Sequence, residues 1–293
     1  KATRRPWRTK PKLGQQGGKL RTATEPGQCI SVNQLESTTP GLIAQIKGWL
    51  TKKRYRVATI FVDHFSGLSY IHLQKSTNAD ETLEAKLAFE RYASKFNVKI
   101  KSYQADNGRF AENKFMAAIK ESGQTITFCG VNAHFQNGRA EKAIRDLSES
   151  ARKQLLHAQA RWPDAIHLAL WPYALRMAVS LHNDLPTLDG GISRSERFSS
   201  IHIGVRLGSL HVFGAPVFAL ENALASGGSL PRWSPRCRLG INLGPSPSHA
   251  RNVSLVLNPD TGCVSPQFHC RFDDFFESVS SQEVSIPKTW QQL

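Results

Sequence analysis

The stretch Arg56-Val57-Ala58-Thr59-Ile60-Phe61-Val62-Asp63-His64-Phe65 is rich in Val, Ile and Phe, the residue types that favour β-strands. Its continuous apolar character indicates a strand buried inside the protein. A Ser66-Gly67 turn follows, and the apolar segment 68–73 comes directly after it. The two segments therefore predict a β-hairpin, and the fold is expected to be built around it.

Strand and helix patterns alternate on both sides of this hairpin. Residues 29–35 alternate like a strand, and a basic insertion at 52–54 separates them from the hairpin. The segments that follow predict a helix capped by Asn78 or Asp80, a strand over 99–105, a helix over 112–121, a strand over 125–129, a loop over 130–138, and helices over 139–160 and 164–183. This order predicts an α/β core with a mixed five-stranded sheet and flanking helices.

After about residue 190 the pattern becomes short and β-rich. Strands are expected over 210–220, 238–243, 253–257 and 263–268, with the hairpin loop Asn258-Pro259-Asp260-Thr261-Gly262 between the last two. We therefore expect a basic, disordered arm over 1–24, a core domain over 25–190, a small, mostly β barrel domain over 195–277, and a linker or tail over 278–293.

Composition excludes several classes of protein. The chain has 293 residues, of which 40% are hydrophobic and 21% charged, as in ordinary globular proteins. No run of eighteen apolar residues exists, so no membrane span is expected. Five scattered cysteines without a C-x-x-C pair argue against a disulfide framework and a zinc knuckle, and favour an intracellular protein. Because the chain begins at Lys1, we expect it to be a piece of a longer polypeptide.

Strong positive charge is the clearest functional signal in the composition. The net charge is +15 and the pI is about 9.9, which favours a polyanionic partner, and nucleic acid is the obvious one. Residues 1–24 carry eight Lys and Arg residues and no acid. This arm is either a solvated tail or a nucleic-acid contact or nuclear-import signal, and its candidate DNA contacts are Arg4, Arg5 and Arg8.

Two carboxylates could meet at one edge of the predicted sheet. Asp106 ends a predicted strand, and Glu141 lies 35 positions later at the start of a predicted helix. Taken singly, an Asp before Asn-Gly usually makes a turn, and a Glu in a first helical turn usually serves the helix dipole. Together they are suited to hold divalent metal ions for phosphoryl transfer, since Mg²⁺ prefers carboxylate oxygens.

Around these carboxylates the sequence resembles the integrase core of copia-type retrotransposons and, more distantly, retroviral integrases. The resemblance rests on Asp106-Asn107-Gly108-Arg109-Phe110, on Gln136-Asn137-Gly138-Arg139-Ala140-Glu141-Lys142, and on the spacing between the two. Phe61-Val62-Asp63-His64-Phe65-Ser66 matches the second strand of that family, and Arg238-Leu239-Gly240 and the hairpin ending Val264-Ser265-Pro266-Gln267-Phe268 resemble its small barrel. The resemblance implies a ribonuclease H-like fold and DNA integration by strand transfer with Mg²⁺ or Mn²⁺.

The resemblance also implies a first catalytic Asp, and this sequence departs from it there. The matching position holds Asn33, a degraded first carboxylate, so Asp106 and Glu141 are the remaining metal ligands. Asp63 is a possible substitute ligand, although its family position does not bind metal. A second departure is the lack of a proline at Ser195, before Glu196. The family further implies a homo-oligomer, a place in the nucleus or in virus-like particles, and an upstream zinc-binding module that this chain does not include.

Several polar residues are candidates for DNA contact. Lys142, Arg145 and Arg152 share the helix of Glu141 and could position DNA phosphates, or they could be a solvated face with a Glu141–Arg145 pair. Asn107 and Gln136 could orient substrate. Three hypotheses therefore stay open: an active integrase, a catalytically dead relic that still binds DNA, and a ribonuclease H-like nuclease, against which the small β domain argues.

Overall fold

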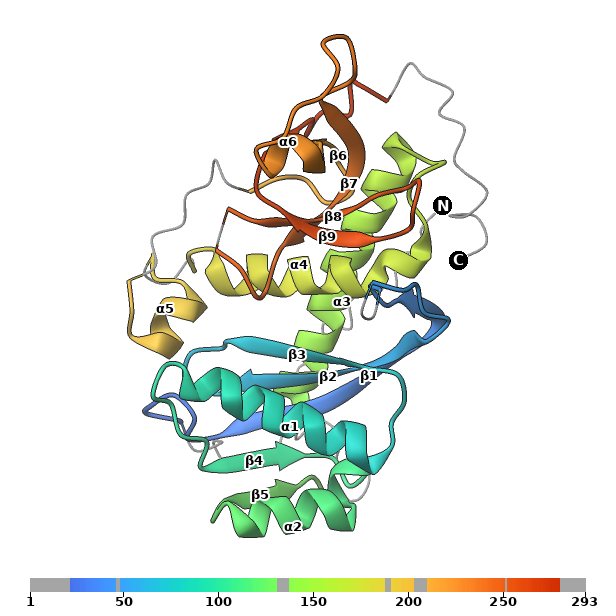
Figure 1. The fold of residues 1–293 in the computed structure, drawn as a ribbon. Helices are drawn as coiled ribbons and strands as arrows, with labels where there is room; N and C mark the ends of the chain where they lie inside the picture. Colours follow the sequence, from blue (N-terminus) through green and yellow to red (C-terminus); the bar gives the residue numbers. More distant parts are fainter. Residues whose placement is uncertain are drawn as a thin grey trace, which may run out of the picture.

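The computed structural model describes residues 22–45, 48–130, 137–187, 191–202, 210–250 and 252–279. Two five-stranded sheets, separated by long helices, make up the described part of the chain, as Figure 1 shows. No helix among these described residues is long and apolar enough to cross a membrane.

The first sheet is the mixed five-stranded sheet that the sequence predicts. Its strands are β1 (Ile30–Leu42), β2 (Arg54–Asp63), β3 (Ser69–Gln74), β4 (Ser102–Ala105) and β5 (Thr125–Phe128). The order is β3-β2-β1-β4-β5, with antiparallel pairing from β3 to β1 and parallel pairing from β1 to β5. The hairpin β2–β3 lies at one side of the sheet, and β1 lies in the centre. This arrangement is that of a ribonuclease H-like fold.

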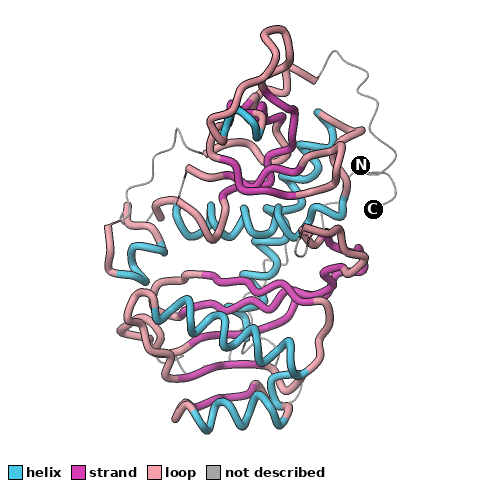
Figure 2. The backbone as a smooth tube through the Cα atoms, viewed as in Figure 1, coloured by secondary structure: helices cyan, strands magenta, loops and turns pink. Residues whose placement is uncertain are grey.

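Helices cover both faces of this sheet. They are α1 (Ala79–Ser94), α2 (Asn113–Glu121), α3 (Gly138–Arg161), α4 (Trp171–Asp184) and the short α5 (Arg194–Ser199). The first of them begins where expected, because the Asn78 side chain accepts a hydrogen bond from the Glu81 amide. In Figures 1 and 2, α1 crosses the front of the sheet and α3 runs behind it.

The alternation of residues along β1 explains the two-sided burial. Ile30 and Val32 pack with Phe89 of α1 in one apolar cluster, whereas Leu35 packs against a second cluster that contains Leu147 of α3. Neighbouring residues of a strand point to opposite faces, so one strand serves both clusters.

The second sheet is antiparallel throughout. Its strands are β6 (Pro216–Leu220), β7 (Cys237–Pro245), β8 (Ser254–Leu257), β9 (Val264–Gln267) and β10 (Cys270–Phe272), in the order β10-β6-β7-β8-β9. A single turn of helix, α6 (Asn222–Ala225), follows β6. The small β domain expected from the sequence is therefore present.

The second sheet and the helices α3 and α4 share one apolar core. Met177 of α4 lies in the same buried cluster as Ile241 and Leu243 of β7, and Leu147 of α3 belongs to it as well. Gly244, at φ +95°, lies so close that a Cβ there would stand 3.3 Å from the Met177 sulfur. The apolar core contains residues from both sides of positions 190–195, where the sequence predicts a domain boundary. The boundary therefore stays a prediction.

Several elements differ from the predictions. The helix expected over 164–183 starts only at Trp171, because Pro172 has no backbone N–H and fits the first helical turn rather than the interior; residues 168–170 before it form a 3₁₀ turn, η3 (Leu168–Leu170). Strand β1 is longer than expected and shifts register between Glu36 and Gly41. The helix α5 is stabilised by a capping box between Ser193 and Glu196, at the place where the family pattern has a proline.

Candidate metal centre at the sheet edge

The register of the first sheet directs Asn33 of β1 and Asp106, which follows β4, toward the same edge. The parallel strands β1 and β4 pair Ile30 with Tyr103 and Ser31 with Gln104. Continuing this register by two positions sets Asn33 beside Asp106, just beyond the carboxyl end of β4. The sheet therefore brings the first two positions of the predicted constellation to one edge.

The N-terminus of α3 is fixed to the same strand, which brings Glu141 toward this edge. The buried Asn137 precedes the helix, and its side-chain amide donates a 3.0 Å hydrogen bond to the carbonyl oxygen of Val32. Arg139 donates a 2.7 Å hydrogen bond to the carbonyl oxygen of His64. Glu141 follows in the first turn of the helix with an exposed side chain. These two anchors hold the start of α3 across β1.

Cys129 follows β5, and its amide donates a 3.0 Å hydrogen bond to the carbonyl oxygen of Ala105, the residue before Asp106. Burial raises the pKa of its thiol, and the negative charges of Asp106 and Glu141 raise this pKa further. The Asn107 side chain donates a 2.7 Å hydrogen bond to the carbonyl oxygen of Cys129 and so ties the turn after β4 to the end of β5. The charges of Asp106 and Glu141 thus both raise the pKa of this thiol.

Neither carboxylate is engaged in an ion pair within the described part of the chain. Asp106 accepts one long hydrogen bond, 3.3 Å from the Gly108 amide. Arg145 lies 3.4 Å from Asp146 rather than bonding Glu141, so the predicted Glu141–Arg145 pair is not formed. With respect to the described residues, oxygens of both carboxylates are therefore free to accept a cation.

The donor set fits one divalent cation better than two. Asn33 is half-buried, and its side-chain oxygen accepts a 2.8 Å hydrogen bond from the Gln34 amide. An amide oxygen can touch a metal ion but supplies no negative charge. In the described ranges, no group of three His, Cys, Asp or Glu side chains is placed to hold a metal. Two carboxylates and one amide would hold a single Mg²⁺ or Mn²⁺.

Asp63 is not brought into this group. Its side chain is fully buried and accepts hydrogen bonds from the Gly27 amide at 2.9 Å and from the Ser66 amide and hydroxyl at 2.7 and 2.6 Å. It pairs with Ile30, three positions along β1 from Asn33, and β1 lies between it and Asp106. One of its oxygens holds Gly27, before β1, and the other holds Ser66 in the turn after β2.

The predicted DNA-contacting residues of α3 lie on one exposed face of the helix. Lys142, Arg145 and Arg152 are exposed, while Ala140, Leu147 and others on the opposite side are buried. Among the predicted contacts, Gln136, Arg4, Arg5 and Arg8 lie outside the described residues, as does most of the loop predicted over 130–138.

A buried polar cluster beside the site was not foreseen from the sequence. The Ser31 hydroxyl and the His64 ring lie 2.8 Å apart, and the His64 carbonyl oxygen accepts the bond from Arg139. Burial and the charge of Arg139 lower the pKa of His64 to about 4. The imidazole is therefore neutral at pH 7. The motif Asp63-His64 carried no signal of this role, since a His after a strand is usually exposed.

Known proteins resemble this chain in sequence and in structure. No family model matches the sequence. Over 143 residues, 47% of this chain, it is 29% identical to the retrovirus-related Pol polyprotein from transposon RE1 of Arabidopsis thaliana, and equally to that from transposon RE2. The chain covers only 9% of the length of each of these relatives.

Solved structures show more distant likeness. The HTLV-2 integrase catalytic core domain, in complex with magnesium, is 18% identical with a TM-score of 0.43, and the match covers 60% of this chain and 98% of that one. A simian T-cell lymphotropic virus intasome is 15% identical with a TM-score of 0.48, covering 86% of this chain and 81% of that one.

Proposed function

We propose that this chain, which is similar to a part of two retrotransposon Pol polyproteins, is an integrase that binds DNA and carries a strand-transfer site weakened at Asn33. The observation that supports this most is that the β1–β4 register and the Asn137–Val32 hydrogen bond direct Asp106 and the start of the helix of Glu141 to β1, where neither carboxylate forms an ion pair with a described residue. A pair of unpaired carboxylates beside exposed cations is suited to hold a divalent metal against a DNA phosphate.

The reaction proposed is a transesterification. The 3′-hydroxyl of one DNA end attacks a phosphodiester of target DNA, a new P–O bond forms, and the target 3′-oxygen leaves and takes up a proton. Lys142, Arg145 and Arg152 would hold phosphates on the exposed face of α3. Asp106 and Glu141 would hold Mg²⁺ or Mn²⁺, which, when bound, supplies charge stabilisation to the attacking and leaving oxygens.

A second candidate function is DNA binding without catalysis. Asn33 favours it, because the position that the family fills with Asp holds a neutral amide whose oxygen already accepts a bond from Gln34. A cation at this edge then has two carboxylates instead of three. Mg²⁺ dehydrates reluctantly and prefers anionic oxygen, so weak, single-metal occupancy and very slow or absent transfer are expected.

Restoring the missing carboxylate tests the proposal. Asn33→Asp should strengthen Mg²⁺ or Mn²⁺ binding in a calorimetric titration and should raise the yield of joined product from synthetic DNA ends. Restored joining would support the weakened-enzyme proposal, whereas DNA binding by both proteins with no joining would favour the relic. Products that are cut but never joined would favour a nuclease. Tight two-metal binding by the Asn33 protein, unchanged in Asn33→Asp, would contradict the role given to this position.

A further inference from the structure

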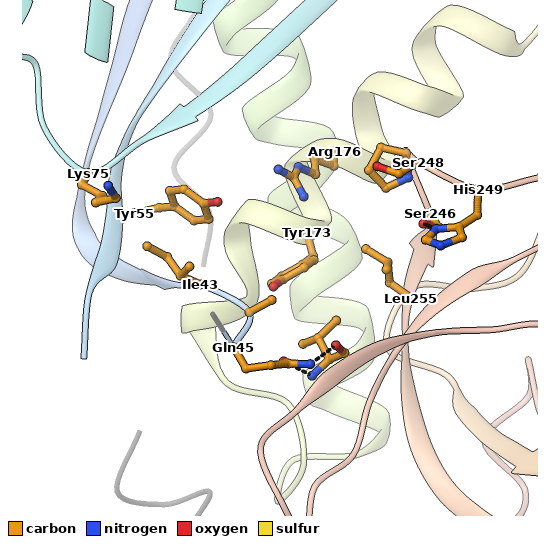
Figure 3. Close-up of a pocket in the computed structure, with 13 residues that line it drawn as sticks. Ile43, Gln45, Tyr55, Lys75, Tyr173, Arg176, Ser246, Ser248, His249 and Leu255 are labelled. Carbon is orange, nitrogen blue, oxygen red and sulfur yellow. Dashed lines mark hydrogen bonds between the residues drawn. The ribbon is translucent and has the colours of Figure 1, made fainter. Parts of the chain in front are cut away.

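A pocket of about 450 Å³ lies between the first sheet, α4 and the second sheet, away from the candidate metal centre. Figure 3 shows its walls: Lys75, Tyr55 and Ile43 on the side of the first sheet, Tyr173 and Arg176 of α4 in the middle, and Ser246, Ser248, His249 and Leu255 on the side of the second sheet. Its volume is in the usual range of small-molecule sites, roughly 300–1,000 Å³.

The walls of this pocket are held together by hydrogen bonds. Gln45, just after β1, donates to the Val264 carbonyl oxygen at 2.7 Å and accepts from the Val264 amide at 2.9 Å, which links positions 219 residues apart. On the opposite wall the Ser246 amide donates to the Val253 carbonyl oxygen at 2.9 Å, and its hydroxyl lies 2.7 Å from the His249 ring. The pocket is therefore formed before any ligand enters.

Arg176 is the feature of this pocket that calls for a ligand. Its side chain is half-buried, yet it makes no hydrogen bond or ion pair with any residue that the structure describes. A guanidinium removed from water without a partner is costly, and proteins normally supply an anion. Burial is the largest cause of the lowered pKa of the half-buried His72; the charge of Glu84 raises this pKa and the charge of Arg176 lowers it, so the guanidinium acts on a neighbouring group.

The remaining lining residues define the chemical class of the ligand. Lys75 is half-exposed and only loosely paired, 3.8 Å from Glu81, and no Asp or Glu lines the pocket. A pocket lined by two cations and by no acidic residue favours an anion as its ligand. A guanidinium binds phosphate through paired hydrogen bonds. Tyr55, Tyr173 and Leu255 supply aromatic and apolar surface for an organic body attached to that anion.

We propose that this pocket binds a nucleoside phosphate, with Arg176 and Lys75 on the phosphate and Tyr55 and Tyr173 against the sugar and base. The nucleotide could be free in solution or could stand at the 5′-phosphorylated end of a DNA strand, because both present the same groups. The site is independent of the metal centre proposed above, since it lies on other elements and uses none of its residues.

Calorimetric titration of the whole chain in EDTA tests the proposal. EDTA removes any contribution of the metal centre, so failure here is separate from failure of strand transfer. The probes are adenosine 5′-monophosphate, inorganic phosphate, and a short DNA strand with or without a 5′-phosphate. Arg176→Met should weaken binding of the monophosphate about tenfold or more, as expected for loss of charge-assisted hydrogen bonds. Arg91→Met, which removes an exposed arginine paired with Glu84, is the matched control and should change nothing.

Two further readouts keep the test decisive. Arg176→Met should fold with an unchanged or higher Tm without ligand, because it removes a charge that has no partner among the residues the structure describes. Tyr55→Leu should weaken the monophosphate but not inorganic phosphate. Binding of the monophosphate alone identifies a free nucleotide, and tighter, Arg176-dependent binding of the 5′-phosphorylated strand identifies a strand end. The proposal would be overturned if neither the monophosphate nor the 5′-phosphorylated strand bound. It would also be overturned if Arg176→Met bound them as tightly as the unchanged protein, or if a Glu-rich peptide bound in an Arg176-dependent way in place of the nucleotide.

Discussion

Two turns of the first sheet each begin with an aspartate, and they use it in opposite ways. Asp63, at the end of β2, is fully buried and accepts hydrogen bonds from Gly27 and Ser66. Asp106, after β4, accepts one long bond from the Gly108 amide, and its charge, like that of Glu141, raises the pKa of Cys129. Both follow a strand and precede turn residues, so the sequence makes them look alike.

The difference lies in how many donors surround each carboxylate. Three donors around Asp63 satisfy the buried charge and leave nothing for a cation. The carboxylate of Asp106 keeps lone pairs open at the sheet edge, which is what a metal ligand needs. The number of hydrogen bonds that an aspartate accepts thus distinguishes a structural aspartate from a candidate metal ligand. The position of the aspartate relative to its strand does not distinguish them.

The largest effect expected from this comparison is on catalysis. In an Asn33→Asp background, Asp106→Asn or Glu141→Gln should lower strand-transfer yield by about a hundredfold or more, because each removes a localised metal ligand. DNA affinity should stay nearly unchanged, since binding uses distributed cations. Transfer assays and gel-shift titrations measure the two quantities. Joining at the level of the background by either variant would show that these carboxylates are not the ligands.

The second effect is on stability and falls on the other aspartate. Asp63→Asn should lower the free energy of unfolding by about 2–3 kcal/mol, because it replaces one charged acceptor by a donor among three hydrogen-bond donors. Asp106→Asn, at the sheet edge, should change it by less than about 0.5 kcal/mol. Urea denaturation of both variants gives the two values. Equal losses of unfolding free energy in the two variants would show that the two turns do not use their aspartates differently.

Acid should act on the first turn through His64, which follows Asp63. Its folded pKa of about 4 lies below the ordinary value of 6.5, so the unfolded chain binds the proton more readily. Stability should therefore fall as the pH drops through 6.5 toward 4, by about 2 kcal/mol between pH 7 and pH 5. Urea denaturation at several pH values measures this slope. His64→Gln should flatten it, leaving the slopes from His72 and His182, whose pKa values are also lowered by burial. A slope unchanged by that substitution would place the acid sensitivity elsewhere.

The smallest effect concerns the cations next to Glu141. The logarithm of the DNA association constant falls linearly with the logarithm of the salt concentration. Removing Lys142 or Arg152 should make this fall less steep, by about 0.9 for each DNA phosphate that the variant no longer neutralises, with only a modest decrease in affinity. Fluorescence anisotropy with a DNA duplex at several salt concentrations measures the slope. Lys114→Gln, an exposed lysine paired with Asp80, is the control. Slopes that are equal for all three variants would make the α3 face a solvated surface.

Prediction from sequence succeeded where periodicity and turn chemistry act locally. The apolar run at 56–65, the Asn78 cap and the amphipathic pattern of α3 correctly indicated the mixed sheet and its helices. The integrase resemblance, based on the motifs around Asp106 and Glu141, is confirmed by the sequence relatives, and its copia-type form is consistent with them. The late start of α4 follows from Pro172, a local signal that the apolar pattern outweighed in the prediction.

Contacts between residues far apart in the chain could not be predicted from the sequence. The bond from Asn137 to the Val32 carbonyl oxygen joins residues 105 positions apart, and the Ser31–His64 contact depends on strand register. The satisfied state of Asp63 depends on the Gly27 amide, 36 positions away. The metal ligands and the DNA contacts remain predictions that the experiments above address, and the domain boundaries remain predictions as well.

The core shared by α4 and β7 has a consequence for synthesis on the ribosome. Helix α4 ends at Asp184, while β7, whose Ile241 and Leu243 cover Met177, ends at Pro245, 61 residues later. At about 5–20 residues per second, the apolar side of α4 waits on the order of 3–12 s for its cover. During that interval the nascent chain presents a helix face that chaperones recognise. Folding of this core is therefore not complete when α4 has emerged, because its apolar side is covered only after β7 has been made.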